Sequence, residues 1–265
     1  MIVANIEKSA DSENRYDLSD DQVVQLTTEL IDEYPHERDD RFVCYTVDGW
    51  SRYANIARKI ECDVFYDAFG NDPEEMMREY GPYEEQSQFF ISVDREERAP
   101  TGVLRIIKNG PAGLKTFNDL EEDQPNFSTE EAMAYHGIES LDDCWEFGTI
   151  AVPEAYRQSQ GGPSLQLYRG MYLASQEAGI KHYVSLIDEG PYLKMKDFLG
   201  IPYKPLHGAQ PTHYLGSEKS LPVYGDAQEF EKAVRRKRWT VRGFMARKAI
   251  KPLLGSKDSS IQFYK

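Results

Sequence analysis

The pattern of apolar and polar residues predicts a mixed α/β chain in which strands and helices are interspersed. Strands are predicted where apolar and β-branched residues run together, at 41–47, 88–93, 101–107, 144–152, 182–187, 212–216 and 221–225. Helices are predicted at 22–34, 51–69, 74–80, 165–179 and 192–198. A short charged turn joins the strands at 88–93 and 101–107, so we expect these two to form a hairpin.

The long stretch between the hairpin and the next strand shows neither pattern. Residues 108–143 are rich in Gly, Pro, Asn, Asp and Glu, with apolar points at Leu114, Phe117, Leu120 and Phe127. Loops of this length are uncommon unless they bind something. We therefore predict a functional loop or lid over the edge of the sheet.

The composition is that of a packed globular protein. The chain has 265 residues, of which 40% are hydrophobic and 12% aromatic, which is enough for one large domain or two small ones. Cys44, Cys62 and Cys144 are too few and too scattered for a disulfide framework or a metal site, so we expect buried free thiols and no metal. The sequence lacks a run of about 20 apolar residues and a secretory signal, and we expect a cytoplasmic protein.

Charge is unevenly distributed along the chain. The net charge of −14 argues against general nucleic-acid binding, because proteins that bind phosphate backbones present a basic face. Residues 232–251, however, contain nine Lys or Arg residues and no acid. These contrasts divide the chain into an acidic N-terminal extension (1–40), a central domain (41–225) and a basic C-terminal helical segment (226–265).

The turn between the predicted strands at 144–152 and 182–187 suits an anion. It contains Gly161 and Gly162 and leads into a helix after Ser164. Such a turn gathers unpaired backbone N–H groups at the positive end of the helix dipole, where phosphate groups bind. The sequence therefore predicts a phosphate cradle here, with an ordinary glycine-rich turn as the alternative.

The order of these elements resembles the GNAT acyltransferase fold, which has a central mixed sheet flanked by helices and would carry helical extensions at both ends here. The family's cofactor loop has an Arg or Gln followed by spaced glycines, which Arg157, Gln158, Gly161 and Gly162 match. Pro163 replaces a second spaced Gly or Ala of the family. The resemblance implies a pantetheine thioester as acyl donor, either acyl-CoA or an acyl carrier protein.

A narrower resemblance lies outside the glycine turn. Residues similar to those of acyl-homoserine-lactone synthases and long-chain N-acyl amino acid synthases are Phe65, Tyr83-Glu84-Glu85, Gly102-Val103-Leu104-Arg105, Phe117 and Trp145-Glu146. The chain differs at Glu61 and Thr149, where those synthases have arginines, and at Asn71, where they have a tryptophan. The resemblance implies acyl transfer to an amine such as an amino acid, with homoserine lactone weakened as the product.

The resemblance also implies binding roles around the thioester. Its pantetheine arm would run between the strands at 144–152 and 182–187, which diverge in the family. The implied donor-binding residues are Ile150, Val152, Arg157, Gln158, Gly161, Gly162 and Ser164. The candidate acceptor and substrate residues are Glu84, Glu85, Phe65, Phe117, Trp145 and Thr149.

Acyl transfer to an amine requires a base and stabilisation of an oxyanion. Glu146 lies among apolar residues of a predicted strand, so it is the candidate base, either acting directly or through a water; a structural role beside Arg105 is the alternative. Arg105 is the candidate partner that orients it. The family's general-acid tyrosine aligns with Lys196, which leaves Tyr192, one turn earlier, as the candidate acid.

Three functions are open at this point. The favoured one is an N-acyltransferase similar to the autoinducer synthases. A GNAT N-acetyltransferase, which would use acetyl-CoA on a metabolite or protein amine, is the second, and a catalytically inert GNAT-like binding module is the third. Residues 232–251 would dock an acidic acyl carrier protein, an anionic membrane surface or nucleic acid, or pack on the acidic body of the protein.

Overall fold

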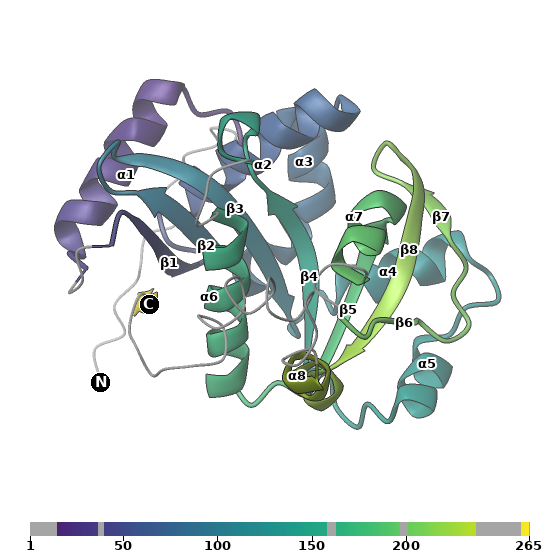
Figure 1. Cartoon of the computed structure of the whole chain (residues 1–265). Helices are drawn as coiled ribbons and strands as arrows, with labels where there is room; N and C mark the ends of the chain where they lie inside the picture. Colours follow the sequence, from purple (N-terminus) through teal and green to yellow (C-terminus); the bar gives the residue numbers. More distant parts are fainter. Residues whose placement is uncertain (1–14, 37–39, 158–162, 197–200, 237–260, 265) are drawn as a thin grey trace, which may run out of the picture.

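The computed structural model describes residues 15–36, 40–157, 163–196, 201–236 and 261–264. Their strands form one nine-stranded sheet in the order β6-β8-β5-β4-β3-β2-β1-β9, with β7 paired to β8 (Figure 1). The strands are β1 (Phe42–Asp48), β2 (Ser87–Asp94), β3 (Ala99–Lys108), β4 (Cys144–Ala151), β5 (His182–Asp188), β6 (Lys204–Pro205), β7 (Thr212–Tyr214), β8 (Ser217–Asp226) and β9 (Ile261–Tyr264). The helices are α1 (Asp20–Glu33), α2 (Ala54–Phe69), α3 (Pro73–Tyr80), α4 (Lys115–Asp123), α5 (Thr129–His136), α6 (Pro163–Glu177), α7 (Glu189–Lys194) and α8 (Ala227–Arg236).

Helices cover both faces of the sheet (Figure 1). On one face, α1 and α2 pack on alternate side chains of β1, β2 and β3. On the other face, Leu167, Met171 and Ala174 of α6 pack on Phe90 and Leu104. Alternation along the strands sends successive side chains into these two cores, which explains why the strands read as nearly continuous apolar runs.

Most of the predicted elements are confirmed. The hairpin consists of β2 and β3, which pair antiparallel, and the predicted mixed sheet holds both parallel and antiparallel pairs. The helix predicted at 192–198 begins earlier, since α7 covers Glu189–Lys194. The three cysteines are free and buried, as expected.

The prediction of a structureless loop at 108–143 is wrong. This region holds α4, α5 and a 3-10 helix at Leu141–Asp143. Leu114, Phe117 and Leu120, spaced three residues apart, put their side chains on one side of α4 and are buried in the core with Phe127. Ser128 caps α5 by accepting a hydrogen bond from the Glu131 backbone. The polar residues that suggested a loop form the outer faces of two short helices.

The first segment is more than a peripheral extension, although the division of the chain into three parts stays a prediction. Tyr16 is completely buried, and Val23, Leu30 and Ile31 of α1 belong to the core on the α2 face. At the other end of the chain, β9 pairs parallel with β1. Most of the basic segment 232–251 lies outside the described residues, apart from the end of α8.

Candidate active site

Strands β4 and β5 separate in the middle of the sheet. They pair in parallel only where Cys144–Glu146 lies beside His182–Val184. Immediately beyond this pairing, the Ser185 hydroxyl donates a 2.8 Å hydrogen bond to the Phe147 carbonyl oxygen. From that point β4 continues along β3 and β5 continues along β8. The sheet therefore has a gap between two adjacent strands, as the resemblance implied for the pantetheine arm.

A β-bulge shapes β4 at the start of this gap. Phe147 lies opposite Ile106 and Thr149 lies opposite Arg105, so Gly148 is the extra residue. A Cβ atom at Gly148 would lie 3.3 Å from Cδ of Arg105, which is tighter than ordinary packing. Because Glu146 and Thr149 pair with Ile107 and Arg105, which are two residues apart, the bulge puts both side chains on the same face of the sheet.

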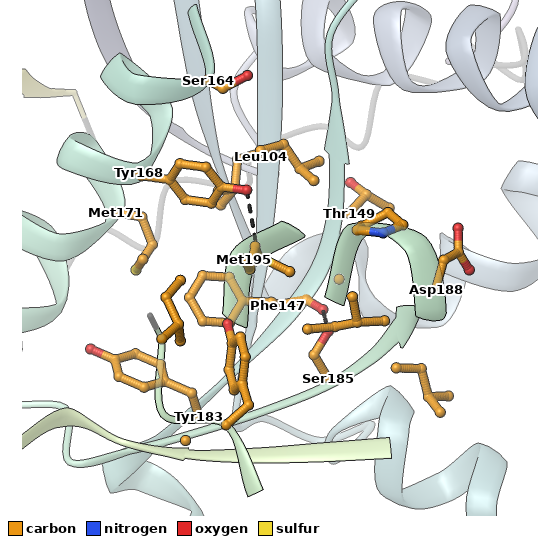
Figure 2. Close-up of a pocket in the computed structure, with 18 of the residues that line it drawn as sticks. Leu104, Phe147, Thr149, Ser164, Tyr168, Met171, Tyr183, Ser185, Asp188 and Met195 are labelled. Atoms are coloured by element: carbon orange, nitrogen blue, oxygen red, sulfur yellow. Dashed lines mark hydrogen bonds between the residues drawn. The ribbon is translucent and has the colours of Figure 1, made fainter. Parts of the chain in front are cut away.

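A cavity of about 850 Å³ opens at the gap. Val64, Phe65 and Phe69 of α2 line it from one face of the sheet, and Tyr168 and Met171 of α6 line it from the other. Tyr168, Met171, Phe147 and Tyr183 belong to the wall on the α6 side, and Figure 2 shows the hydrogen bond that joins Ser185 to Phe147. The cavity wall is mainly apolar, and its charged members among the described residues are Arg157, Asp188 and Asp226. The volume is within the range of small-molecule sites.

Glu146 lies close to this cavity but is covered. Its side chain is 3% exposed and its carboxylate accepts a 2.9 Å hydrogen bond from the Thr116 backbone N–H at the start of α4. Burial raises the pKa of Glu146 to about 7, against the opposing effect of the hydrogen bonds from Thr116. Tyr80 and Tyr214 line the cavity, and the charge of Glu146 adds to the effect of burial in raising the pKa of each. A carboxyl group with a pKa near 7 is suited to act as a general base.

Arg105 does not pair with Glu146, contrary to the expected partnership. It is fully buried and binds Glu61, with Nη2 at 2.6 Å from Oε2, and Glu84, with Nη1 at 3.1 Å from Oε1. Its Nη2 also donates to the Tyr16 hydroxyl at 2.6 Å. These partners come from α2, from the turn before β2 and from the N-terminal segment. Glu146 therefore carries no ion pair with Arg105, which leaves its pKa free to rise.

The carboxylate of Glu84 is also engaged. It pairs with Arg58 as well as Arg105, and its Oε1 accepts a 2.5 Å hydrogen bond from the Tyr16 hydroxyl. Burial opposes the charged form, but the guanidinium groups of Arg105 and Arg58 keep the pKa of Glu84 below its ordinary value. The side chain is thus committed to a buried ion network, whereas the neighbouring Glu85 is exposed and does not line the cavity.

The remaining predicted substrate residues fall into two groups. Phe65 and Thr149 line the cavity, and the Thr149 hydroxyl donates to the Glu61 carboxylate. Phe117 and Trp145 are buried in the cores on opposite faces of the sheet and do not line the cavity. The structure therefore brings only Phe65 and Thr149 of this set to the cavity wall.

Several of the predicted donor-binding residues surround one end of the cavity. Ile150, Arg157 and Ser164 line it, and Arg157 also donates from Nε to the Val152 carbonyl at 2.9 Å. Ser164 lies in the first turn of α6, at the top of the view in Figure 2. Gln158, Gly161 and Gly162 lie outside the described residues.

The candidate general acid is not in the cavity wall. Tyr192 belongs to α7, and the Lys196 ammonium lies 5.6 Å from the centre of its ring. Pro191 and Met195 line the cavity, while Tyr192 and Lys196 do not. The site therefore lacks an acid at the positions that the sequence suggested.

Sequence reasoning missed several residues of the wall. The tyrosines of the cavity come from five separate elements or loops, at Tyr80, Tyr168, Tyr172, Tyr183, Tyr203 and Tyr214. Asp188 accepts a 3.0 Å hydrogen bond from Ser220, and Asp226 accepts from the Glu229 backbone at the start of α8. Alternation along β5 indicates that Tyr183 and Ser185 share one face of the sheet, but no pattern in the sequence indicates that Tyr80 of α3 lines the same cavity.

In the described part of the chain, no three His, Cys, Asp or Glu side chains gather in a way that would hold a metal ion. None of the described helices combines the length and the apolar character of a membrane span.

Proteins with a fold similar to that of this chain are found among the solved structures. No protein-family model matches the sequence, and no curated protein matches it. FeeM, an N-acyl amino acid synthase from uncultured soil microbes, has a TM-score of 0.54 over 73% of this chain and 94% of its own, with 15% identity. BjaI, a CoA-dependent acyl-homoserine lactone synthase determined with SAM and isopentyl-CoA, has a TM-score of 0.50 over 84% of this chain and 93% of its own, with 13% identity.

Proposed function

We propose that this chain, which has the GNAT-like fold of the N-acyltransferases it resembles, moves an acyl group from a pantetheine thioester to an amine such as an amino acid. The observation that carries the proposal is the mainly apolar cavity of about 850 Å³ at the gap between β4 and β5, next to a buried carboxyl group with a raised pKa. A cavity of this size and character favours a long acyl chain over an acetyl group.

The donor would bind along the edge of the gap. Its phosphate end would lie at the first turn of α6, where Ser164 and the helix dipole favour an anion and Arg157 adds a positive charge. The resemblance assigns Gln158, Gly161 and Gly162 to the same role, and they lie outside the described residues. The pantetheine arm would then follow β4 past Ile150 and Val152 to the bulge at Gly148.

Glu146 would act as the base. An α-ammonium group has a reference pKa of about 8, so a carboxylate whose own pKa is about 7 is well matched to accept its proton. Because Glu146 is covered, the proton would reach it through a water molecule or after a small movement of the wall. Phe65 and Thr149 would contact the substrates, and Glu85 is the remaining acidic candidate for holding the acceptor ammonium.

The basic segment would dock the donor when the donor is an acyl carrier protein. Such carriers are acidic, and residues 232–251 hold nine basic residues and no acid. Charge reversal at Arg235, Arg236 and Arg238 should raise KM for an acyl carrier protein and leave KM for the matching acyl-CoA unchanged. An unchanged KM for the carrier protein would remove this part of the proposal.

The function is tested by mass spectrometry of lipid extracts from cells that overexpress the wild-type protein or Glu146→Gln. We expect an N-acylated product with the wild type that is absent with the variant, and its mass identifies both the acyl chain and the acceptor. Purified protein is then given donors of increasing acyl length. Preference for acetyl-CoA would replace the proposal with an N-acetyltransferase, and no product from any donor would favour an inert binding module.

A further inference from the structure

The oxyanion that forms when an amine attacks a thioester needs a hydrogen-bond donor, and the predicted general acid does not supply it. Tyr192 and Lys196 do not line the cavity. Tyr168 does, but its hydroxyl donates to Sδ of Met195 at 3.7 Å (Figure 2). The hydroxyl of Tyr214, also in the wall, donates to Asp119 at 2.5 Å. These two hydroxyl protons are therefore already engaged within the protein.

Tyr80, the last residue of α3, is placed differently. It lines the cavity while being only 2% exposed, and none of the other described residues forms a hydrogen bond with its hydroxyl. A buried phenol normally finds a hydrogen-bond partner, because leaving one unmade is costly. A hydroxyl in a cavity wall without a partner is available to a ligand.

The ring of Tyr80 is held beside the bulge. The centre of the ring lies 4.4 Å from Cζ of Arg105 and 5.5 Å from Nζ of Lys115. Arg105 is in turn the cross-strand partner of Thr149, and its side chain packs against Gly148. Two cation–π contacts thus fix Tyr80 next to the point where β4 separates from β5.

The hydroxyl also stays protonated. Burial, together with the negative charges of Glu61 and Glu146, raises the pKa of Tyr80 well above its ordinary value, although the charge of Arg105 works in the opposite direction. An ordinary tyrosine is already protonated near pH 7, so the raised pKa keeps Tyr80 a neutral donor in the range where Glu146 titrates.

We propose that Tyr80 is a catalytic residue whose hydroxyl donates a hydrogen bond to the thioester carbonyl oxygen; this inference rests on the proposed function. The amine nitrogen attacks the carbonyl carbon, a C–N bond forms, and the carbonyl electron pair moves onto the oxygen that Tyr80 holds. Glu146 takes the proton from nitrogen, the electron pair on oxygen re-forms the C=O bond as the C–S bond breaks, and the thiolate leaves with the C–S electron pair and is protonated from solvent. Tyr80 keeps its proton throughout.

The test compares Tyr80→Phe with Tyr83→Phe. Phenylalanine keeps the ring over Arg105 and removes only the hydroxyl, and Tyr83 is a buried neighbour whose hydroxyl bonds Asn118 away from the cavity wall. Loss of one oxyanion donor lowers kcat by about 100-fold to 1,000-fold. We expect that loss in Tyr80→Phe with little change in KM for the donor, and wild-type kcat in Tyr83→Phe.

A binding measurement addresses the same hydrogen bond without turnover. Two pantetheine analogues of the donor are used, an S-(2-oxoalkyl) ketone that keeps the carbonyl and an S-alkyl thioether that lacks it. Calorimetry should show that the wild type binds the ketone more tightly and that Tyr80→Phe weakens only the ketone, by about fivefold for one neutral hydrogen bond.

The results separate a failure of the role of Tyr80 from a failure of the proposed function. Equal kcat in the wild type and Tyr80→Phe overturns the role of Tyr80 and leaves the proposed function intact. Equal affinity of the wild type for the two analogues also overturns it, whether or not the variant folds. If the wild type forms no acylated product, the proposed function fails and the role of Tyr80 fails with it.

Discussion

Ser185 and Phe147 join two strands at the first position past their backbone pairing. The Ser185 hydroxyl donates a 2.8 Å hydrogen bond to the Phe147 carbonyl, and Ser185 itself is buried in the cavity wall. A side chain here replaces the backbone hydrogen bond that a continuous parallel pair would make. This bond sets where the gap begins, and with it the place at which a thioester would lie.

Replacing Ser185 with alanine removes this hydrogen bond and should therefore lower the free energy of unfolding. A buried carbonyl that loses its donor costs about 1–3 kcal/mol of unfolding free energy, measurable by urea denaturation. The matched control is Thr46→Val, because the buried Thr46 hydroxyl has no partner among the described residues and its loss should cost nothing. Equal unfolding free energies for wild type and Ser185→Ala would contradict this account of the gap.

Glu84→Gln should destabilise the protein strongly. The change leaves Arg58 and Arg105 buried with one carboxylate fewer, and breaking a buried ion pair from one side costs about 3–5 kcal/mol. The exposed neighbour provides the control, since Glu85→Gln should change the unfolding free energy by less than about 0.5 kcal/mol. Similar denaturation midpoints for the two variants would show that the network contributes little.

The same carboxylate predicts a pH effect on stability. The pKa of Glu84 is lower in the folded protein than the ordinary value of 4.5, so its contribution is present above that value. This stabilisation is lost as the pH falls through the lower pKa of the folded state. The unfolded chain takes up the proton at a higher pH than the native protein does, so acid favours unfolding. Acid should therefore reduce the stability of the wild type more steeply than that of Glu84→Gln, as followed by circular dichroism.

The Glu146 carboxyl group should change stability with pH in the opposite direction from Glu84. Its pKa rises from 4.5 to about 7 on folding, so the native state holds the proton more tightly and stability falls as the pH rises between these values. Between about pH 5 and about pH 8 this group should cost the wild type about 2–3 kcal/mol, a loss that Glu146→Gln escapes. Denaturation of both proteins at the two pH values measures the difference, and parallel pH curves would mean that Glu146 titrates normally.

Replacing Gly170 of α6 with alanine should create a packing defect. A Cβ atom at this position would lie 2.9 Å from Sγ of Cys44 and 3.0 Å from Cδ1 of Phe90, so alanine would push the helix off the sheet. Overpacking of this kind costs about 1–3 kcal/mol. Gly190→Ala is the control, since nothing lies within 4 Å of the added carbon. Thermal unfolding should separate the two variants, and a Gly170→Ala protein as stable as the control would exclude the clash.

The sequence allowed the sheet to be predicted but not the contacts that form across it. Apolar runs located β1 to β5 because burial on both faces leaves a continuous signal. Glu146 was recognisable as an isolated acid within such a run. The bulge at Gly148 was not recognisable from the sequence. In a regular strand Glu146 and Thr149 would lie on opposite faces of the sheet, so the bulge decides which side chains share a face with Glu146.

Two other errors have a common cause. Arg105 was expected to bind Glu146, yet its partners are 44, 21 and 89 residues away in the chain, at Glu61, Glu84 and Tyr16. Likewise α4 was read as loop because polar residues, Gly and Pro dominate 108–143, and its few apolar residues are buried against elements that are distant in the chain. Local periodicity carries no information about contacts of this range.

The buried network around Arg105 also imposes an order on synthesis of the protein. Tyr16 leaves the ribosome first and Thr149 last among its members, and the hydroxyl of Thr149 closes onto Glu61 across 88 residues. Until β4 has emerged, the carboxylate of Glu61 lacks this hydroxyl donor and the network around Arg105 is incomplete. A nascent chain that ends before β4 therefore holds the buried charges of Glu61 and Arg105 without their full set of partners, and the N-terminal half completes this core only once β4 has been made.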